Sequence, residues 1–459
     1  MFKFTPNAST GERLYSVGLL TNASDENEVK ATLAKLDKIN ERYAIVKIGG
    51  SVGVADLSTC PPDLLSETGF NTLFKNKMVS VQTQRGFKKE TLAHLWMAWE
   101  HRREYDGGIV FAPGRTVPRN QLNLFQGFAT EPHKGNWDRM ERHLREVVCQ
   151  GNEEHYEWLM SWFADILQNP GREKVGTAVV LCGKEGTGKS IIFRYFREMI
   201  GLQYGVEVSQ KEHLVGRFNN HLASALFAQV EEAVWAGDKQ AEGVLKHLIT
   251  SERMPCEKKG LDRFEVDSYT RFAFTSNEKW VVPASAEARR FFVLEVSDEH
   301  MQNRGYFEAL NVEMKNAGGL EAWMYALMNW VKPDWVDLRN PPKTDALGAQ
   351  ILESLPVEKR FFVEAIQAGR YFGDKRLSCW KSEIYPDYEE YVTKRGAKHA
   401  ATEQRFGMAL SAVWNFGDEH VSEKKRYLGK WDRLYWLPPL DEAREWVADN
   451  LNISADLLD

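Results

Sequence analysis

The residues with the clearest chemical pattern form the segment GKEGTGKS, from Gly183 to Ser190. This segment matches the phosphate-loop pattern G-x-x-x-x-G-K-[ST] at every fixed position. The apolar run Thr177–Cys182 before it predicts a buried strand, and Ile191–Ile200 after it predicts a helix, which is the context the motif requires. Glycines allow the backbone N–H groups to turn onto a phosphate, and the helix start adds the positive end of a dipole.

Lys189 of this loop can reach the β and γ phosphates of a nucleoside triphosphate, and the Ser190 hydroxyl can ligate Mg²⁺. The alternative interpretation is a glycine-rich turn between strand and helix that contains a lysine by chance. We predict ATP and Mg²⁺ as cofactors. The candidate nucleotide contacts are Gly183, Glu185, Gly186, Thr187, Gly188, Lys189 and Ser190.

A second candidate is the acidic pair Glu231-Glu232, which follows the apolar segment Ala225–Val230. A strand that delivers two acids beside a phosphate loop is typical of a Walker B site. Glu231 would hold Mg²⁺, because hard cations prefer oxygen ligands, and Glu232 would act as the general base on the attacking water. By itself, such a pair is also common in a solvated turn.

Two further candidates follow at the ends of predicted strands. Asn277 comes directly after the apolar run at Arg271–Thr275, and its amide can both donate to a γ phosphate and accept from water. The pair Arg289-Arg290 precedes the segment Phe291–Val296, and a guanidinium can neutralise charge on a γ phosphate. The simpler interpretations are an asparagine turn and a surface arginine pair.

These candidates lie in a region, residues 172–300, where predicted strands and helices alternate. This order favours an α/β fold with a largely parallel sheet, which binds ligands at the carboxyl ends of its strands. Other predicted elements lie before this core. They are a helix at Glu28–Arg42, a hairpin around Gly49-Gly50, a helix at Lys89–Arg103 and two helices at Trp137–Cys149 and Glu153–Gln168.

The region after the core predicts helices at Val357–Ala368, Ser382–Thr393 and Thr402–Val413. A basic segment follows, with Tyr427 and Trp431 between its cationic residues. Helices followed by a basic hairpin are in the order of a winged helix, which contacts either DNA or protein. The interleaved aromatic residues suit nucleic acid and equally suit a small packed hairpin.

Composition sets wider bounds on the 459-residue chain. Its hydrophobic fraction is 43% and its net charge is −6, so any contact with nucleic acid must come from local basic patches. The five scattered cysteines form no C-x-x-C pair, which fits a reducing cytosol. We find no apolar run long enough for a membrane span and no signal peptide, and no clustered aspartates of a polymerase or primase centre. The expected location is the cytoplasm of a bacterial or phage-infected cell.

The four motifs, in this order and spacing, resemble those of the superfamily-three helicases of viruses, phages and plasmids. They are most similar to the helicase part of phage and plasmid primase-helicase proteins. The most specific segment is TRFAFTSNEKWVVPASAEARRFFVLEVS, and LNLFQGF, ILESL and LYWLPPL also fit, so that the resemblance covers most of residues 110–440. Two departures are expected: the acids read Glu-Glu where Asp-Glu is frequent, and the polymerase-primase domain that relatives often carry in front is not predicted within these residues. Priming would then come from a separate primase or polymerase.

The resemblance implies an AAA+ fold and a ring, usually a hexamer, with ATP between subunits and an arginine supplied by the neighbour. It also implies a pore hairpin that grips single-stranded or forked DNA. Lysines at a glycine-containing tip can hold phosphates without reading sequence, and a phenylalanine can stack on a base. The corresponding residues here are Lys258, Lys259, Arg263 and Phe264.

The sequence therefore predicts an α/β protein with an AAA+ P-loop NTPase core, an α/β N-terminal accessory region, a helical segment before the core and a winged-helix-like C-terminal domain. The boundaries expected are 1–105, 106–170, 171–335 and 345–459. The function expected is an ATP-dependent DNA helicase or translocase of a phage, plasmid or mobile element. One alternative is an AAA+ remodeller or loader of proteins; another, a small-molecule P-loop kinase, leaves Asn277 and Arg289-Arg290 without roles.

Overall fold

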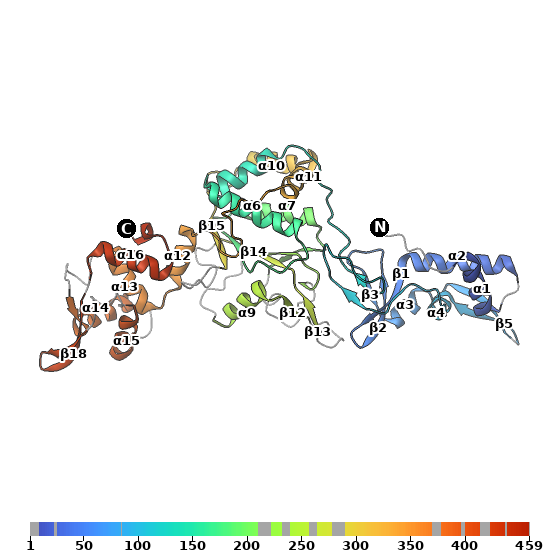
Figure 1. Cartoon of the computed structure of the whole chain (residues 1–459), viewed down its shortest axis with the longest axis horizontal. Helices are drawn as coiled ribbons and strands as arrows, with labels where there is room; N and C mark the ends of the chain where they lie inside the picture. The colour runs from blue at the N-terminus through green and yellow to red at the C-terminus, as the bar shows by residue number, and fades with distance from the viewer. Residues whose placement is uncertain are drawn as a thin grey trace.

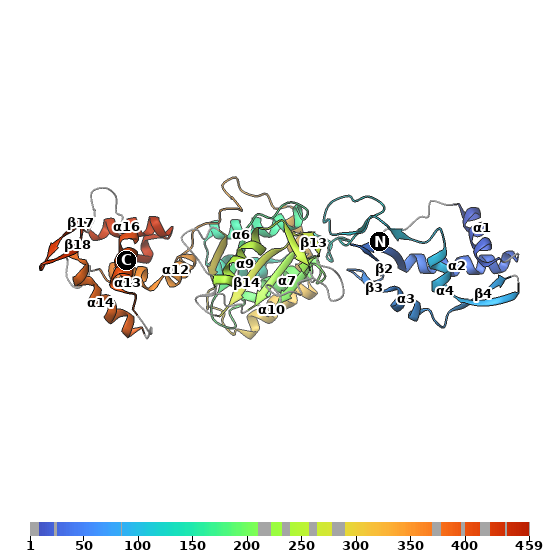
Figure 2. The ribbon, with the colours of Figure 1, turned by 90° about the horizontal axis from the view of Figure 1, so that it is seen from below.

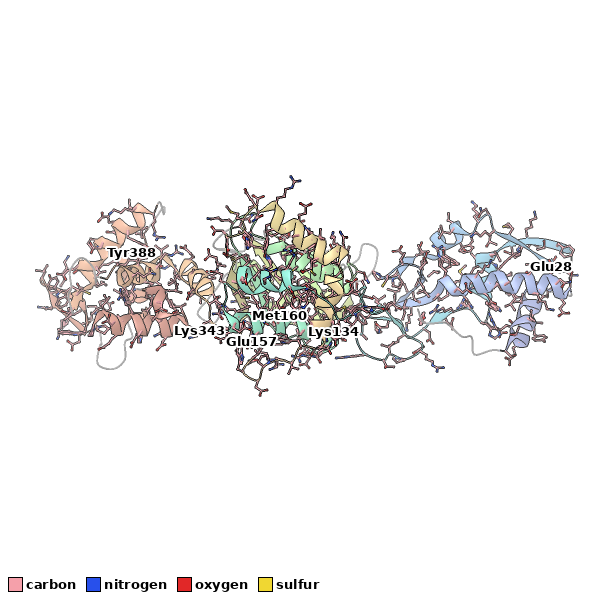
Figure 3. All side chains as sticks on the ribbon, turned by 90° about the horizontal axis from the view of Figure 1, so that it is seen from above. Glu28, Lys134, Glu157, Met160, Lys343 and Tyr388 are labelled. Carbon is pink, nitrogen blue, oxygen red and sulfur yellow. The ribbon has the colours of Figure 1, made fainter. Side chains whose placement is uncertain are left out.

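The structure is a computed structural model that describes most of the chain in eleven segments. They are 9–22, 25–83, 85–209, 222–231, 239–256, 264–277, 290–369, 378–395, 400–413, 423–436 and 438–458. The described parts lie in a row, with the N-terminal region at one end, a larger central part and the C-terminal region at the other end (Figures 1 and 2). Glu28, Met160 and Tyr388 mark these three parts in Figure 3.

A five-stranded, fully parallel sheet forms the centre of the molecule and makes the chain a mixed α/β protein. The strand order is β10-β11-β14-β9-β15. The strands are β9 (Ala178–Cys182), β10 (Gly205–Val208), β11 (Phe227–Glu231), β14 (Arg271–Ser276) and β15 (Phe291–Glu295). Four of them confirm predicted strands; the sequence analysis missed β10, whose four residues are too few for a clear pattern.

Strand β9 lies between β14 and β15, so the chain leaves it toward one edge of the sheet and later returns on its other side. A reversal of this kind opens a crevice at the carboxyl ends of the strands, where α/β sheets bind ligands. The carboxyl ends of β9, β11 and β14 all lie at that end of the sheet, because the strands are parallel.

Helices cover both faces of this sheet, which explains its continuous apolar strands. Val179 and Leu181 face a cluster formed with α6 (Glu153–Gln168), α7 (Lys189–Ile200) and α11 (Gly319–Met328). The intervening Val180 faces a second cluster, which includes residues of α9 (Lys239–Thr250) and α12 (Asp345–Ser354). In Figure 1, α6, α7, α10 (Arg304–Asn316) and α11 lie above the sheet and α9 lies below it.

The two helices predicted directly before the core, at Trp137–Cys149 and Glu153–Gln168, are present, with one modification. Helix α6 has the predicted bounds, and eleven of its residues are buried. The first helix begins as α5 (Asp138–Arg142) and continues as a π-helix over His143–Val148. Such π-helical turns are rare and occur frequently at functional sites.

The N-terminal region combines α1 (Thr10–Thr21) and α2 (Glu26–Arg42) with a four-stranded sheet in the order β3-β2-β1-β6. The hairpin predicted around Gly49-Gly50 is confirmed by β1 (Tyr43–Ile48) and β2 (Ser51–Asp56). This region also contains β3 (Asp63–Leu65), α3 (Glu67–Leu73) and β6 (Glu104–Tyr105). Two short strands, β7 (Ile109–Val110) and β8 (Leu122–Asn123), link this region to the core.

The prediction of one helix over Lys89–Arg103 is wrong. Lys89 belongs to a hairpin of β4 (Met78–Thr83) and β5 (Gly86–Thr91), and the helix α4 spans only Leu92–Ala98. The Thr91 side chain caps α4 by accepting from the His94 N–H, so the cap fixes where the helix begins. Large apolar side chains of this segment are nevertheless buried, among them Trp96 and Trp99.

The C-terminal region contains the predicted helices as α13 (Val357–Gln367), α14 (Lys381–Lys394) and α15 (Glu403–Val413). A three-stranded antiparallel sheet in the order β16-β18-β17 accompanies them. Its strands are β16 (Ser378–Trp380), β17 (Glu423–Tyr427) and β18 (Lys430–Trp436), and α16 (Leu440–Leu451) follows. None of the helices in the described ranges is long and apolar enough to cross a membrane.

Candidate nucleotide-binding site

The loop between β9 and α7 has the backbone of an anion-binding turn. Gly183, Gly186 and Gly188 have φ angles of 146°, 80° and 92°, which side chains other than glycine rarely adopt. A Cβ atom on Gly188 would also lie 2.7 Å from both His143 and Phe307. Helix α7 begins immediately after this glycine, so its free N–H groups and dipole point to the loop.

The Lys189 side chain folds back onto the loop and donates to its carbonyl oxygens. Its Nζ donates to the carbonyl oxygens of Gly183, at 2.7 Å, and of Lys184, at 2.5 Å. It also lies 3.1 Å from Oδ1 of Asn277 at the end of the neighbouring strand β14. Burial lowers the pKa of Lys189. A bound phosphate would give Lys189 a charged acceptor, with which it forms a stronger hydrogen bond than with these neutral oxygens.

A cavity of about 280 Å³ lies over this loop, at the carboxyl ends of β9, β11 and β14. The residues that line it come from all three strand ends. They are Glu185, Gly186, Gly188, Lys189, Ser190, Ile191, Glu231, Thr275, Ser276 and Asn277. Seven residues singled out in the sequence thus meet around one cavity, while Gly183 and Thr187 belong to the loop itself, where Thr187 Oγ1 donates to the Lys184 carbonyl at 3.0 Å.

Glu231 is held in place from within its own sheet. Its Oε1 accepts from Nε2 of Gln229 at 2.8 Å, and Gln229 Oε1 accepts in turn from Arg197 of α7 at 3.2 Å. Arg197 also pairs with Glu207 of β10. Together, the Glu231 carboxylate and the Ser190 hydroxyl offer the hard oxygen ligands that Mg²⁺ prefers, so the residues present fit this ion.

Arg290 lies away from this cavity. Its carbonyl accepts from the N–H of Ala178, the first residue of β9, so Arg290 stands at the amino end of the sheet. The loop begins at the opposite end, about 16 Å along a five-residue strand. The Arg290 side chain therefore cannot serve the loop of its own chain.

Several candidates cannot be located. Glu232, Lys258, Lys259, Arg263 and Arg289 lie outside the described residues. Phe264 is the first residue of β13 (Phe264–Asp267), which pairs antiparallel with β12 (Arg253–Cys256). The two strands that would carry the proposed pore hairpin are therefore present.

Sequence reasoning missed His143, which is fully buried beneath the loop. Its Nε2 lies 3.3 Å from the Gly188 carbonyl oxygen, and its Nδ1 lies 3.0 Å from the Tyr306 hydroxyl of α10. Burial lowers the pKa of His143 to about 4. The only signal in the sequence is a histidine among the apolar residues of a predicted helix, which indicates burial and not a partner 45 residues away.

Comparison with known proteins gives three findings. Residues 181–290 match a family described as a family of unknown function, DUF5906, and this range contains the loop, Glu231 and Asn277. A DNA primase-polymerase of Nitratiruptor phage NrS-1 is 26% identical over 174 residues, which are 36% of this chain and 23% of that protein. This chain thus matches less than a quarter of the relative's length.

Solved structures of the NrS-1 C-terminal region share the fold. An apo structure of its residues 305–718 superposes with a TM-score of 0.59 and 16% identity, over 86% of this chain and 96% of that one. An A-form apo structure gives a TM-score of 0.58 at 16% identity, over 84% and 94%. The chain therefore shares the fold of the NrS-1 C-terminal region over most of its length.

Proposed function

We propose that this chain is an ATP-driven DNA helicase or translocase that acts in the replication of a phage, plasmid or mobile element. The observation that carries the proposal is the contact of Lys189 Nζ with Asn277 Oδ1, 3.1 Å apart, above a cavity that Glu231 also lines. Cation, amide and carboxylate are the groups that phosphoryl transfer to water requires, in the positions expected from the motifs.

Each residue has a separate task in this proposal. The loop N–H groups and Lys189 bind the phosphates, and Lys189 exchanges its loop carbonyls for phosphate oxygens. Ser190 and Glu231 hold Mg²⁺, which would neutralise phosphate charge when bound. Glu232 takes the proton of the attacking water, and Asn277 orients that water against the γ phosphate.

The site is proposed to be completed by a second subunit. Arg290 stands at the amino end of the sheet, where it is remote from its own loop but available to a neighbour's loop in a head-to-tail ring. A ring, a hexamer by resemblance, with the β12–β13 hairpin directed at single-stranded DNA would couple hydrolysis to movement. We assign the core to the AAA+ superfamily-three helicases because of the order of its motifs on the parallel sheet. We assign the C-terminal region to the winged helices because three helices precede its β17–β18 hairpin.

The relatives support a role in DNA replication, since one is named as a DNA primase-polymerase of a phage. This chain would act in the cytoplasm of the host cell, beside a separate primase or polymerase. Both the separate primase or polymerase and the helicase activity are part of this proposal, because the sequence match covers 23% of the relative.

The proposal is tested with purified full-length protein by ATP hydrolysis with and without single-stranded DNA, and by unwinding of a forked duplex. Lys189→Ala should abolish both activities. Lys184→Ala is the matched control, because this lysine of the same loop points outward to Asp298, 2.6 Å away. A rate of ATP hydrolysis that single-stranded DNA does not change, together with no unwinding, would overturn the helicase assignment in favour of a protein remodeller.

A further inference from the structure

The hairpin of β17 and β18 lies in the C-terminal part of the molecule (Figure 2). Its strand register gives it two chemically different rows of side chains. Cross-strand partners share a face, and successive residues alternate between faces. The register Lys424↔Arg433 and Arg426↔Trp431 therefore defines one row, which we call the cationic row. The other row, the packed row, contains Glu423, Lys425, Tyr427, Lys430, Asp432, Leu434 and Trp436.

The packed row is attached to the body of the C-terminal region. The Tyr427 ring stacks on Trp380 with 4.4 Å between centroids, and its hydroxyl donates to Glu383 at 2.8 Å. Asp432 is buried and accepts from the Ser382 hydroxyl at 2.6 Å. The two lysines and two acids of this row balance in charge, and Lys425 pairs with Glu423.

The cationic row begins at Tyr435, which is buried and donates to the Gly407 carbonyl of α15 at 3.4 Å. From there it runs outward along the hairpin through Arg433 to Trp431, which is 64% exposed, and Arg426 and Lys424 are exposed opposite. The row has three cations and no acid. The Arg426 guanidinium lies over the Trp431 ring, 5.9 Å from its centroid.

The tip joins the two strands by a tight turn. Leu428 and Gly429 have φ angles of 48° and 80°, the two positive values of a two-residue hairpin turn that fits the strand twist. Leu428 is 87% exposed. The hairpin packs against the body through Tyr427, Asp432 and Tyr435. The outer part of the cationic row, from Arg433 to the tip, instead presents a large exposed aromatic ring between cations.

We propose that the cationic row is a binding site for single-stranded nucleic acid. Trp431 stacks on an unpaired base, while Lys424, Arg426 and Arg433 hold the flanking phosphates. A duplex offers the phosphates but keeps its bases stacked inside, so an exposed tryptophan favours a single strand. The site lies in the C-terminal region, and it does not depend on the ATPase assignment.

The experiment measures binding of a fluorescent 30-nucleotide oligothymidylate to the full chain by anisotropy, without nucleotide, over a range of salt concentrations. Trp431→Ala should weaken binding about 5- to 150-fold with little change in salt dependence, and Trp431→Phe should restore most of the affinity. Lys424→Ser with Arg426→Ser should instead reduce the slope of log K against log salt by about 1.4.

The matched control is Lys425→Ser with Lys430→Ser, which removes the same charge from the packed row of the same hairpin. Each change is also made in a Lys258→Ala, Lys259→Ala background, so that loss of the proposed pore contact is measured separately. Equal weakening by the two double variants, or no weakening by Trp431→Ala, overturns the proposal. If Trp431→Ala weakens binding to a blunt duplex as much as binding to oligothymidylate, the single-strand assignment is overturned. Comparing the affinities for oligouridylate and oligothymidylate identifies RNA or DNA as the ligand.

Discussion

The Nε2 atom of His143 lies 3.3 Å from the carbonyl oxygen of Gly188, so the π-helix touches the last residue of the loop before α7. A carbonyl only accepts, so Nε2 carries the proton, and the neutral ring then accepts the Tyr306 hydroxyl at Nδ1. Tyr306 stacks in turn on His300 at 3.9 Å between centroids. This chain of contacts holds Gly188 in its positive-φ conformation from outside the motif.

His143→Ala is therefore expected to raise the dissociation constant for ATP about 2- to 10-fold, the value of one lost net hydrogen bond. His143→Gln retains an N–H donor and should bind ATP nearly as the unchanged protein does. A fluorescent ATP analogue measures both. His94→Ala, on the exposed side of α4, is the control, and equal affinity for all three variants would contradict the role of His143.

The same histidine predicts a dependence of stability on pH. The pKa of His143 is lowered by burial from 6.5 to about 4, so the unfolded chain binds more protons than the folded one between these values. The free energy of unfolding should therefore fall on acidification from about pH 6.5 to 4, by up to about 3 kcal/mol. Urea denaturation of the unchanged protein and His143→Gln should give curves that diverge in this window; parallel curves would contradict it.

Asn277 predicts a loss of turnover without loss of binding. Asn277→Ala removes the amide beside Lys189 Nζ but leaves the loop that binds phosphate, so the affinity for ATP should change little. We expect kcat to fall about 100-fold or more, as when a positioned polar group is removed from a transition state. Asn329→Ala is the control, because its Nδ2 donates to the Tyr325 carbonyl oxygen at its own helix end. A fall in affinity with unchanged kcat would show that Asn277 binds and does not orient water.

Much of this site could be predicted from the sequence because its residues follow strands directly. The loop, Glu231 and Asn277 are each adjacent to an apolar run, and parallel strands bring their ends together without further information. The sequence alone could not place Arg290 at the opposite, amino end of the sheet, because that placement depends on how β15 is aligned with β9. His143 could not be found, because its contact with the loop depends on how a separate helix packs.

The misplaced helix start has an equally local cause, and the register settles a question that the sequence left open. Lys89–Arg103 has helical apolar spacing, but pairing of Lys89 with Ser80 and the cap at Thr91 determine its start. Along β17 and β18, the sequence shows Tyr427 and Trp431 alike as aromatic residues between cationic ones. Only the register separates the packed tyrosine from the exposed tryptophan.

A buried ion pair at the amino end of β14 predicts a large effect on stability. Arg271 and Asp165 are 4% and 5% exposed, with Nη2 and Oδ2 3.2 Å apart, and Arg172 lies 3.0 Å from the other carboxylate oxygen. Asp165→Asn leaves the Arg271 charge buried without its anion, which costs about 3–5 kcal/mol. Asp165→Asn combined with Arg271→Met should recover most of this loss. Thermal unfolding measures both, with Glu26→Gln in an exposed pair as the control; a wild-type Tm for Asp165→Asn would contradict the prediction.

Arg290 supplies the test of a shared site. Arg290→Ala and Lys189→Ala should each be inactive alone, because each removes one half of every site in a uniform ring. In an equal mixture, about one interface in four combines an intact loop with an intact arginine from the neighbour, so hydrolysis should return to roughly a quarter. An inactive mixture would contradict a site shared between subunits, and full activity of Arg290→Ala alone would place Arg290 outside the site. The same mixing experiment with Arg289→Ala then determines whether the neighbouring arginine completes it.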